Sequence, residues 1–226
     1  YPNGKKAYEG RFKDDMPIGE FKRFREDGTL KVALNYNSTN NYSKATFYTS
    51  DGKVVAEGFY SEKNKDSLWQ YYNANSTLVY EERYVKGVKH GRYKQYYENG
   101  KTMETIPYIN GKIDGVMVQF HANGLNKAIV NFSNGQQDGS IKLFYDNGKV
   151  RIEGNYLNGL KNGEWKFYDA DGKLTDKINY NKGIPENYNK LAERENKELE
   201  LMFRNAGRIQ EPTTESLLES VGARPY

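Results

Sequence analysis

The stretch Tyr145-Asp-Asn-Gly-Lys-Val-Arg-Ile-Glu-Gly-Asn-Tyr-Leu-Asn-Gly-Leu-Lys-Asn-Gly-Glu-Trp-Lys-Phe-Tyr168 is one copy of a unit that recurs every 24 residues along most of the chain. Seven of the eight units carry a turn glycine at the same position, and Ser76 stands there in the remaining one. The seven are Gly4, Gly28, Gly52, Gly100, Gly124, Gly148 and Gly172. A fixed period of this length indicates a repeat array.

Other positions of the unit are equally regular. An aromatic residue stands eight positions after every turn residue, and further glycines recur eleven and fifteen positions after it, as Gly159 and Gly163 do. The aromatic series is Phe12, Tyr36, Tyr60, Tyr84, Tyr108, Phe132, Tyr156 and Tyr180. In the quoted unit, Ile152, Gly154 and Tyr156 alternate as residues of a half-buried strand do.

Each unit is therefore predicted to form two antiparallel strands, here Lys149 to Leu157 and Gly163 to Tyr168, reversed at Asn158-Gly159. The Asx-Gly pair that opens most units readily takes the positive φ angles of a tight hairpin. The glycine fifteen positions on, as in Gly163 or Gly115, is expected to let an aromatic ring lie against bare backbone. The predicted fold class is mainly β, an elongated single-layer antiparallel meander of consecutive hairpins over residues 1–184.

The segment 185–226 departs from the repeat and is predicted to be a helical cap and tail. Pro185 marks the boundary, and Gly207 is placed to end a helix. The apolar residues at helical spacing are Tyr188, Leu191, Ala192, Leu199, Met202, Phe203 and Ala206. We expect the helix to cover the exposed edge of the last strand, with docking into another protein as the alternative. Beyond it, Leu217, Leu218, Val221 and Tyr226 are candidate partner-binding residues.

Two stretches inside the array are irregular. The second unit has Thr39 and Ser43 where glycines are expected, which indicates either a drifted loop or a surface altered for a partner. Asp66-Ser67-Leu68 resembles an O-glycosylation tripeptide of exported bacterial proteins, so Ser67 is a candidate for modification.

The amino-acid composition limits the structures, partners and sites that the chain can have. It is 36% hydrophobic with 20 tyrosines, which suits a thin structure whose rings cover apolar surface while their hydroxyls reach water. Its 34 basic and 30 acidic residues nearly cancel, so we expect no nucleic-acid partner. The absence of cysteine excludes disulfides and thiolate sites. No stretch approaches the roughly 18 apolar residues of a membrane-spanning helix.

No catalytic, cofactor or metal site is expected. His90 and His121 are the only imidazoles, and both stand in repeat positions. Glu9, Glu57 and Glu153 share another repeat position, which indicates a structural hydrogen bond or strand charge rather than a catalytic carboxylate. None of the glycines precedes a helix whose N-terminus would hold a phosphate.

The quoted unit, and the segment Tyr84 to Tyr96 with Lys86-Gly87 and His90-Gly91, resemble the bacterial variant of the MORN repeat, as found in YwqK-family antitoxins. The resemblance covers about residues 1–183. It implies an elongated, twisted sheet of consecutive β-hairpins and a scaffold for protein contacts. Many bacterial relatives look exported or lipid-anchored. Because this chain starts in mid-pattern at Tyr1, we expect that an export signal or lipid anchor precedes it in the native protein.

The function predicted from these observations is a non-catalytic protein–protein interaction scaffold or accessory subunit of an extracytoplasmic complex, including one at the outer membrane. The partner is expected to be another protein, and any membrane association is expected through the N-terminal anchor rather than through the repeats. Alternatives are a cytoplasmic antitoxin that binds a toxin directly and a peripheral lipid- or glycan-binding module.

Overall fold

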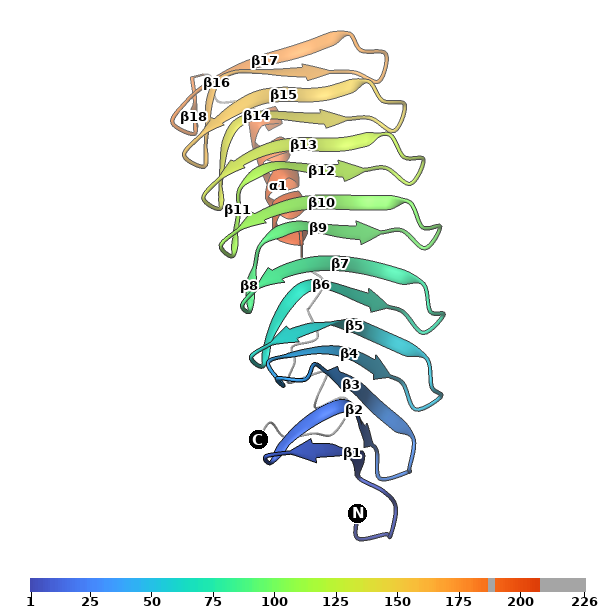
Figure 1. Ribbon diagram of the computed structural model, residues 1–226. Coiled ribbons are helices and arrows are strands. Elements are labelled where there is room, and N and C mark those ends of the chain that lie inside the picture. The colour runs from blue at the N-terminus through green and yellow to red at the C-terminus, as the bar shows by residue number, and fades with distance from the viewer. Residues whose placement is uncertain (187–189, 208–226) are drawn as a thin grey trace. The chain divides into compact units, whose positions relative to one another are not determined.

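The computed structural model describes residues 1–186 and 190–207, and its contacts divide the chain into two compact units, with the boundary in the sequence between Gly91 and Arg92. The strands of the first unit are β1 (Tyr8–Lys13), β2 (Met16–Phe24), β3 (Leu30–Tyr36), β4 (Tyr42–Tyr48), β5 (Val54–Ser61), β6 (Asn64–Tyr72), β7 (Leu78–Val85) and β8 (Val88–Lys89). Each pairs antiparallel with the next (Figure 1).

The described part of the second unit has the same hairpin pattern, followed by a helix. Its elements are β9 (Gly91–Tyr96), β10 (Thr102–Ile109), β11 (Lys112–Ile113), β12 (Gly115–Phe120), β13 (Asn126–Ser133), β14 (Gln136–Phe144), β15 (Val150–Leu157), β16 (Leu160–Tyr168), β17 (Leu174–Asn181), β18 (Ile184–Pro185) and α1 (Lys190–Asn205). The predicted mainly β class, with consecutive antiparallel hairpins and a C-terminal helix, is confirmed. No helix among the described residues is long and apolar enough to cross a membrane.

The two turns of each unit differ, and the hairpin geometry predicted for the opening turn occurs at the other one. At the opening Asx-Gly pair only the glycine has a positive φ (83° at Gly148), while the Asn147 Oδ1 accepts the N–H of Lys149 at 3.0 Å. The pair with two positive φ angles lies at the other end of the hairpin, with 50° at Asn158 and 78° at Gly159. That second turn matches the two-residue type I′ geometry, in which both central residues need positive φ.

Ser76 occupies the turn-glycine position with a φ of 60°, a region that costs a residue with a side chain more than it costs glycine. We expect Ser76→Gly to stabilise the protein by about 0.5–1 kcal/mol, net of the greater freedom of glycine in the unfolded chain. Urea unfolding measures this change. The matched control, Ser133→Gly at the end of β13, should destabilise the protein, because that position needs no positive φ. Equal effects from both variants would contradict the assignment.

Bare backbone under an aromatic ring occurs at a different glycine position from the one predicted. Gly163 has a positive φ of 72° and nothing within 4 Å of an added Cβ, so its role is conformational. A Cβ on Gly154 would instead lie 2.3 Å from the Trp165 ring, and one on Gly58 equally close to the Trp69 ring. The missing side chains therefore make room for the two largest side chains in the core, both 0% exposed.

The irregular second unit forms an ordinary hairpin with a longer loop. Strands β3 and β4 pair in register from Val32–Phe47 to Tyr36–Ser43, and residues 37–41 connect them. Asn37 Nδ2 donates to the Asn41 Oδ1 at 2.7 Å, and Asn40 takes the positive φ of 55°. The drifted glycine positions thus have a local structural explanation.

The sequence predicted that the C-terminal helix covers the exposed edge of the last strand. Helix α1 lies elsewhere. Contacts of the helix lie on β13 and β15, and Gly207, just past its end, contacts β10, so the helix covers a sheet face (Figure 1). An aromatic face can bury the apolar side of a helix, whereas the two-residue β18 at the edge offers little surface. Gly207 does follow the helix end with a φ of 67°, as predicted. Pro185, the predicted boundary, still pairs with Tyr180 as part of β18.

Candidate functional site

The candidate site is the sheet face of the second unit that α1 covers, here called the inner face. The Phe203 ring lies between the rings of Phe132 and Tyr156, with centroids 6.2 Å from each and near-perpendicular planes. Leu199, one helical turn earlier, is 3% exposed. Two members of the aromatic repeat series therefore form a socket for one helix side chain.

Polar contacts hold the helix at both ends of this socket. Arg151 donates to both oxygens of Glu198 at 2.9 and 2.7 Å, a paired geometry that is stronger than a single ionic contact. Past the helix end, the Gly207 N–H donates to the Glu104 Oε1 at 3.1 Å, and Gln119 Nε2 donates to the other oxygen at 2.7 Å. Since every unit offers a similar aromatic position, these contacts fix which units the helix lies on.

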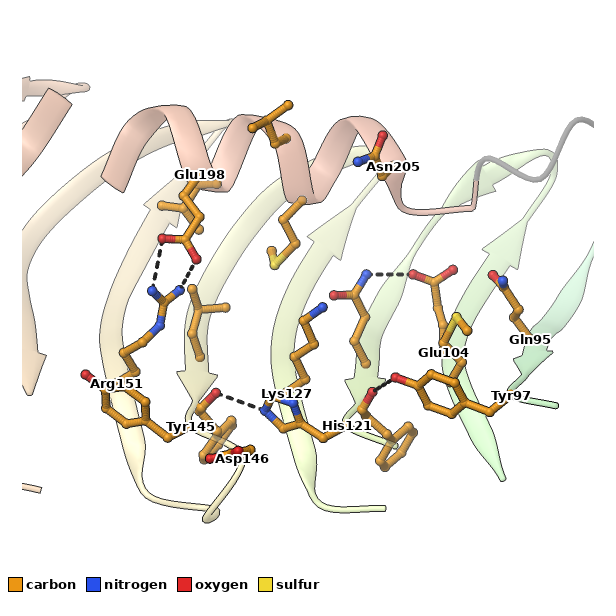
Figure 2. A pocket seen from close by; sticks show the side chains of 18 residues that line it. Gln95, Tyr97, Glu104, His121, Lys127, Tyr145, Asp146, Arg151, Glu198 and Asn205 are labelled. Atoms are coloured by element: carbon orange, nitrogen blue, oxygen red, sulfur yellow. Dashed lines mark hydrogen bonds and ion pairs between the residues drawn. The ribbon is translucent and has the colours of Figure 1, made fainter. Parts of the chain in front are cut away.

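An open groove of about 960 Å³ runs between α1 and the sheet (Figure 2). It has aromatic, amide and charged walls, formed by residues that include Gln95, Tyr97, Glu104, Gln119, His121, Lys127, Tyr145, Arg151, Glu198 and Asn205. A second cleft of about 530 Å³ involves Tyr156, Lys161, Leu199 and Phe203. The helix therefore leaves much of the inner face open.

Lys127 and Arg151 point toward α1 because of β-bulges. Gln119 pairs with Ala128 and Phe120 with Asn126, so Lys127 is an extra residue in its strand. Arg151 is extra in β15 in the same way. A strict alternation would place both side chains on the face opposite Ala128 and Ile152, whereas a bulge redirects them. For this reason neither residue was predicted from the sequence, although each stands three positions after a turn glycine.

The turn edge of the groove is held by a ladder of side chains. Tyr97 donates to the Phe120 carbonyl at 2.7 Å and Tyr145 to the Tyr168 carbonyl at 2.8 Å. A ring nitrogen of His121 lies 3.1 Å from the Phe144 carbonyl, in the equivalent position. His121 thus does the same work as two tyrosines, which agrees with its interpretation as a repeat residue.

The shared glutamate position is structural in two of its three members. Tyr72 donates to Glu57 at 3.0 Å and Tyr168 donates to Glu153 at 2.8 Å. Glu9 forms an ion pair with Lys6 at 2.6 Å instead. The expected structural hydrogen bond is therefore confirmed at Glu57 and Glu153.

Glu104 is 4% exposed, and burial raises its pKa even though Gln119, Gly207 and Lys127 favour the charged form. A folded-state pKa above the unfolded value means that Glu104 contributes stability below about pH 4.5 that is lost as pH rises through the folded pKa. We therefore expect the free energy of unfolding of Glu104→Gln to increase relative to that of the wild type as pH rises through the folded-state pKa of Glu104.

The geometry suits this neutral replacement, because the buried Gln119 Oε1 has no hydrogen-bond partner and can accept from a glutamine amide. Unfolding of both proteins in urea between pH 4 and 8 measures the difference. A difference that stays constant with pH would show that Glu104 does not titrate in this way.

The residues singled out from the sequence are placed as follows. All seven turn glycines have positive φ, and the aromatic series is buried or half-buried except for Phe12, which is 52% exposed on β1. Ser67 is half-buried, has a φ of 58° in a glycine position and donates to Asp66 at 3.0 Å, and its modification stays a prediction. Leu217, Leu218, Val221 and Tyr226 lie outside the described residues. Over residues 1–186 and 190–207, no group of three His, Asp or Glu side chains is placed to hold a metal.

Comparison with known proteins identifies the repeat. Residues 89–110, 137–158 and 161–182 match the family model described as the MORN repeat variant. The resemblance to that repeat is thereby confirmed, while the match does not reach the finer resemblance to YwqK-family proteins. No curated protein matches the chain.

Several solved structures show partial similarity. One is a TarM mutant of S. aureus in complex with fondaparinux, alpha-GlcNAc-glycerol and UDP, with 15% identity, a TM-score of 0.34, and coverage of 48% of this chain and 21% of that one. Another is the pneumococcal O-GlcNAc transferase GtfA with UDP and GlcNAc, with 16% identity, a TM-score of 0.30, and coverage of 46% and 21%. The chain spans about a fifth of the length of these proteins. TM-scores of this size do not establish a common fold.

Proposed function

We propose that this chain, in which residues 89–110, 137–158 and 161–182 match the MORN repeat variant, is a non-catalytic protein-interaction module whose inner face receives an amphipathic helix of a partner protein. The observation that carries the proposal is α1 itself, seated on that face through Phe203 and the Arg151–Glu198 pair. Repeats of this kind serve generally in protein or lipid interaction. A helix laid into an apolar groove is a common recognition mode.

The composition of the inner face supports binding. Aromatic rings and arginine dominate the energetics of protein interfaces, and here Phe132, Tyr156 and Arg151 lie together. The grooves beside α1 leave room for a second element or for a different helix. A non-catalytic role is supported by His121, whose ring is engaged with the Phe144 carbonyl in a repeated structural position.

We further propose that the module works outside the cytoplasm as an accessory subunit. The support is the resemblance of its repeats to exported bacterial proteins. Fractionation of the native host with protease protection tests this setting, and recovery of the protein in the cytosolic fraction alone would contradict it.

A charge reversal tests the helix-receiving face. The probes are labelled peptides of residues 190–207, either wild type or with Glu198→Arg, and the proteins are the full chain and its Arg151→Glu variant. In the wild type, the tethered helix competes at an effective concentration on the order of millimolar and keeps binding weak. In Arg151→Glu, like charges repel the tethered helix, so we expect the Glu198→Arg peptide to bind about tenfold tighter than the wild-type peptide.

The matched control is Lys142→Glu, which reverses a cation that pairs with Glu153 at 3.6 Å and is not among the residues lining the groove. That variant should show no preference for the reversed peptide. Failure of the Arg151→Glu protein to bind either peptide, or equal binding of both, would rule out the proposed face.

A further inference from the structure

We infer that Lys127 and Arg151 together recognise a partner helix that carries two acidic residues seven positions apart. Helix α1 has only the first of these two acidic residues, Glu198. This inference rests on the proposed function and specifies the chemistry of the partner. The two cations stand in the same position of successive units, each three residues after a turn glycine and each on a bulge. In the flanking units of the same face, that position holds the uncharged Met103 and Thr175.

The spacing of the cations matches a helix. Neighbouring strands lie about 4.8 Å apart, so one unit of two strands advances about 9.6 Å. A helix rises about 1.5 Å per residue, and that advance corresponds to between six and seven residues. Seven residues are close to two full turns, so positions seven apart point to the same side of the helix. An acidic pair at this spacing can therefore face both cations.

The direction of α1 shows which position would face Lys127. Glu198 pairs with Arg151, and just past the C-terminal end of the helix the Gly207 N–H donates to Glu104, so the helix runs from β15 toward β10. Seven residues after Glu198 stands Asn205, which lines the same groove as Lys127. Figure 2 shows Lys127 projecting toward the helix between Glu198 and Asn205.

Lys127, unlike Arg151, has no acidic partner on the described part of α1. It makes no ion pair with any described residue, while Arg151 has the bidentate pair with Glu198. The buried carboxylate of Glu104 acts on Lys127 only at longer range and is already bonded by Gln119 and Gly207. A neutral amide at 205 cannot neutralise the ammonium. A helix with an acid there would gain an interaction that α1 lacks.

The partner helix is thus defined by three side chains: an acid opposite Arg151, an aromatic ring five residues later for the Phe132–Tyr156 socket, and a second acid two residues after that opposite Lys127. Both ionic contacts lie beside an open groove, so each adds selectivity more than affinity.

Peptides of residues 190–207 that carry Asn205, Asn205→Glu or Asn205→Gln test this inference against the full chain bearing Phe203→Ala, which loosens the tethered helix without touching either cation. The glutamine peptide is the matched neutral control for side-chain length. We expect the glutamate peptide to bind about two- to fivefold tighter than the glutamine peptide, as for a partly exposed ion pair. The gain should vanish when Lys127→Gln is added to the protein.

The outcomes separate the two proposals. Binding of all three peptides with equal affinity, or a gain in affinity that persists in the Lys127→Gln protein, would contradict recognition of a second acid by Lys127. Either result would leave the proposal of a helix-receiving face unaffected. Absence of binding by every peptide would overturn the face and this inference with it.

Discussion

Replacing Glu82 by alanine is expected to lower the free energy of unfolding by about 3–5 kcal/mol, the usual cost of breaking a buried ion pair from one side. Glu82 is 1% exposed and lies 3.1 Å from the Lys89 ammonium. Tyr84 and Tyr71 donate to its Oε1 at 2.6 and 3.0 Å, and Lys65 donates to the Tyr71 hydroxyl at 2.7 Å. Alanine would remove the buried carboxylate that faces the Lys89 ammonium and accepts hydrogen bonds from Tyr71 and Tyr84.

Urea unfolding followed by fluorescence measures the loss. The control is Glu26→Ala at an exposed turn of the same unit, which should change stability by less than about 0.5 kcal/mol. If Glu82→Ala is too unstable to purify, Glu82→Gln keeps the shape while removing the charge and should still destabilise the protein. A loss below about 1 kcal/mol in both Glu82 variants would contradict a central role for this carboxylate.

Gly154→Val should cost about 3 kcal/mol, at the upper end for overpacking a core. A Cβ at this position would lie 2.3 Å from one atom of the Trp165 ring and 2.5 Å from another. Trp165 is fully buried, and its Nε1 donates to the Asn155 carbonyl at 3.2 Å, so the ring has little freedom to move.

The neighbouring unit suggests how to relieve the clash. There Val130 pairs with Ile141, and both are 0% exposed. The double variant Gly154→Val with Trp165→Ile copies that pair, so we expect its loss of stability to be smaller than the sum of the two single losses by about 1–3 kcal/mol. Strictly additive losses in urea unfolding would show that the two positions do not share one packing volume.

The sequence predicted the repeat, the hairpins and the helix because each depends on local residue choice. Period alone locates the turns, and Gly207 marks the helix end. The assignment of turn geometry was wrong because Asn-Gly occurs at both turns of a unit. At Asn147-Gly148 the asparagine bonds its own turn, whereas at Asn158-Gly159 it takes a positive φ. The dipeptide does not distinguish these two cases.

The candidate site could not be predicted from the sequence, for a different physical reason. Phe132 and Tyr156 were recognised as repeat residues, but their role as a socket depends on where α1 returns to the sheet. Lys127 and Arg151 reach the same face only because of bulges, which change the register by one residue. Periodicity fixes which residues are equivalent, while long-range packing decides which equivalents are used.

The position of α1 with and without a competing helix tests the central claim most directly. Because the chain has no cysteine, spin labels can be attached at Leu201→Cys on α1 and Val116→Cys on β12, both about half exposed in the wild type. The distance between the labels is then measured alone and with saturating Asn205→Glu peptide. We predict one narrow distribution for the protein alone, and a longer, broader one when the peptide has displaced the helix. A broad distribution without peptide, or an unchanged distance with peptide bound, would contradict a face that exists to hold a helix.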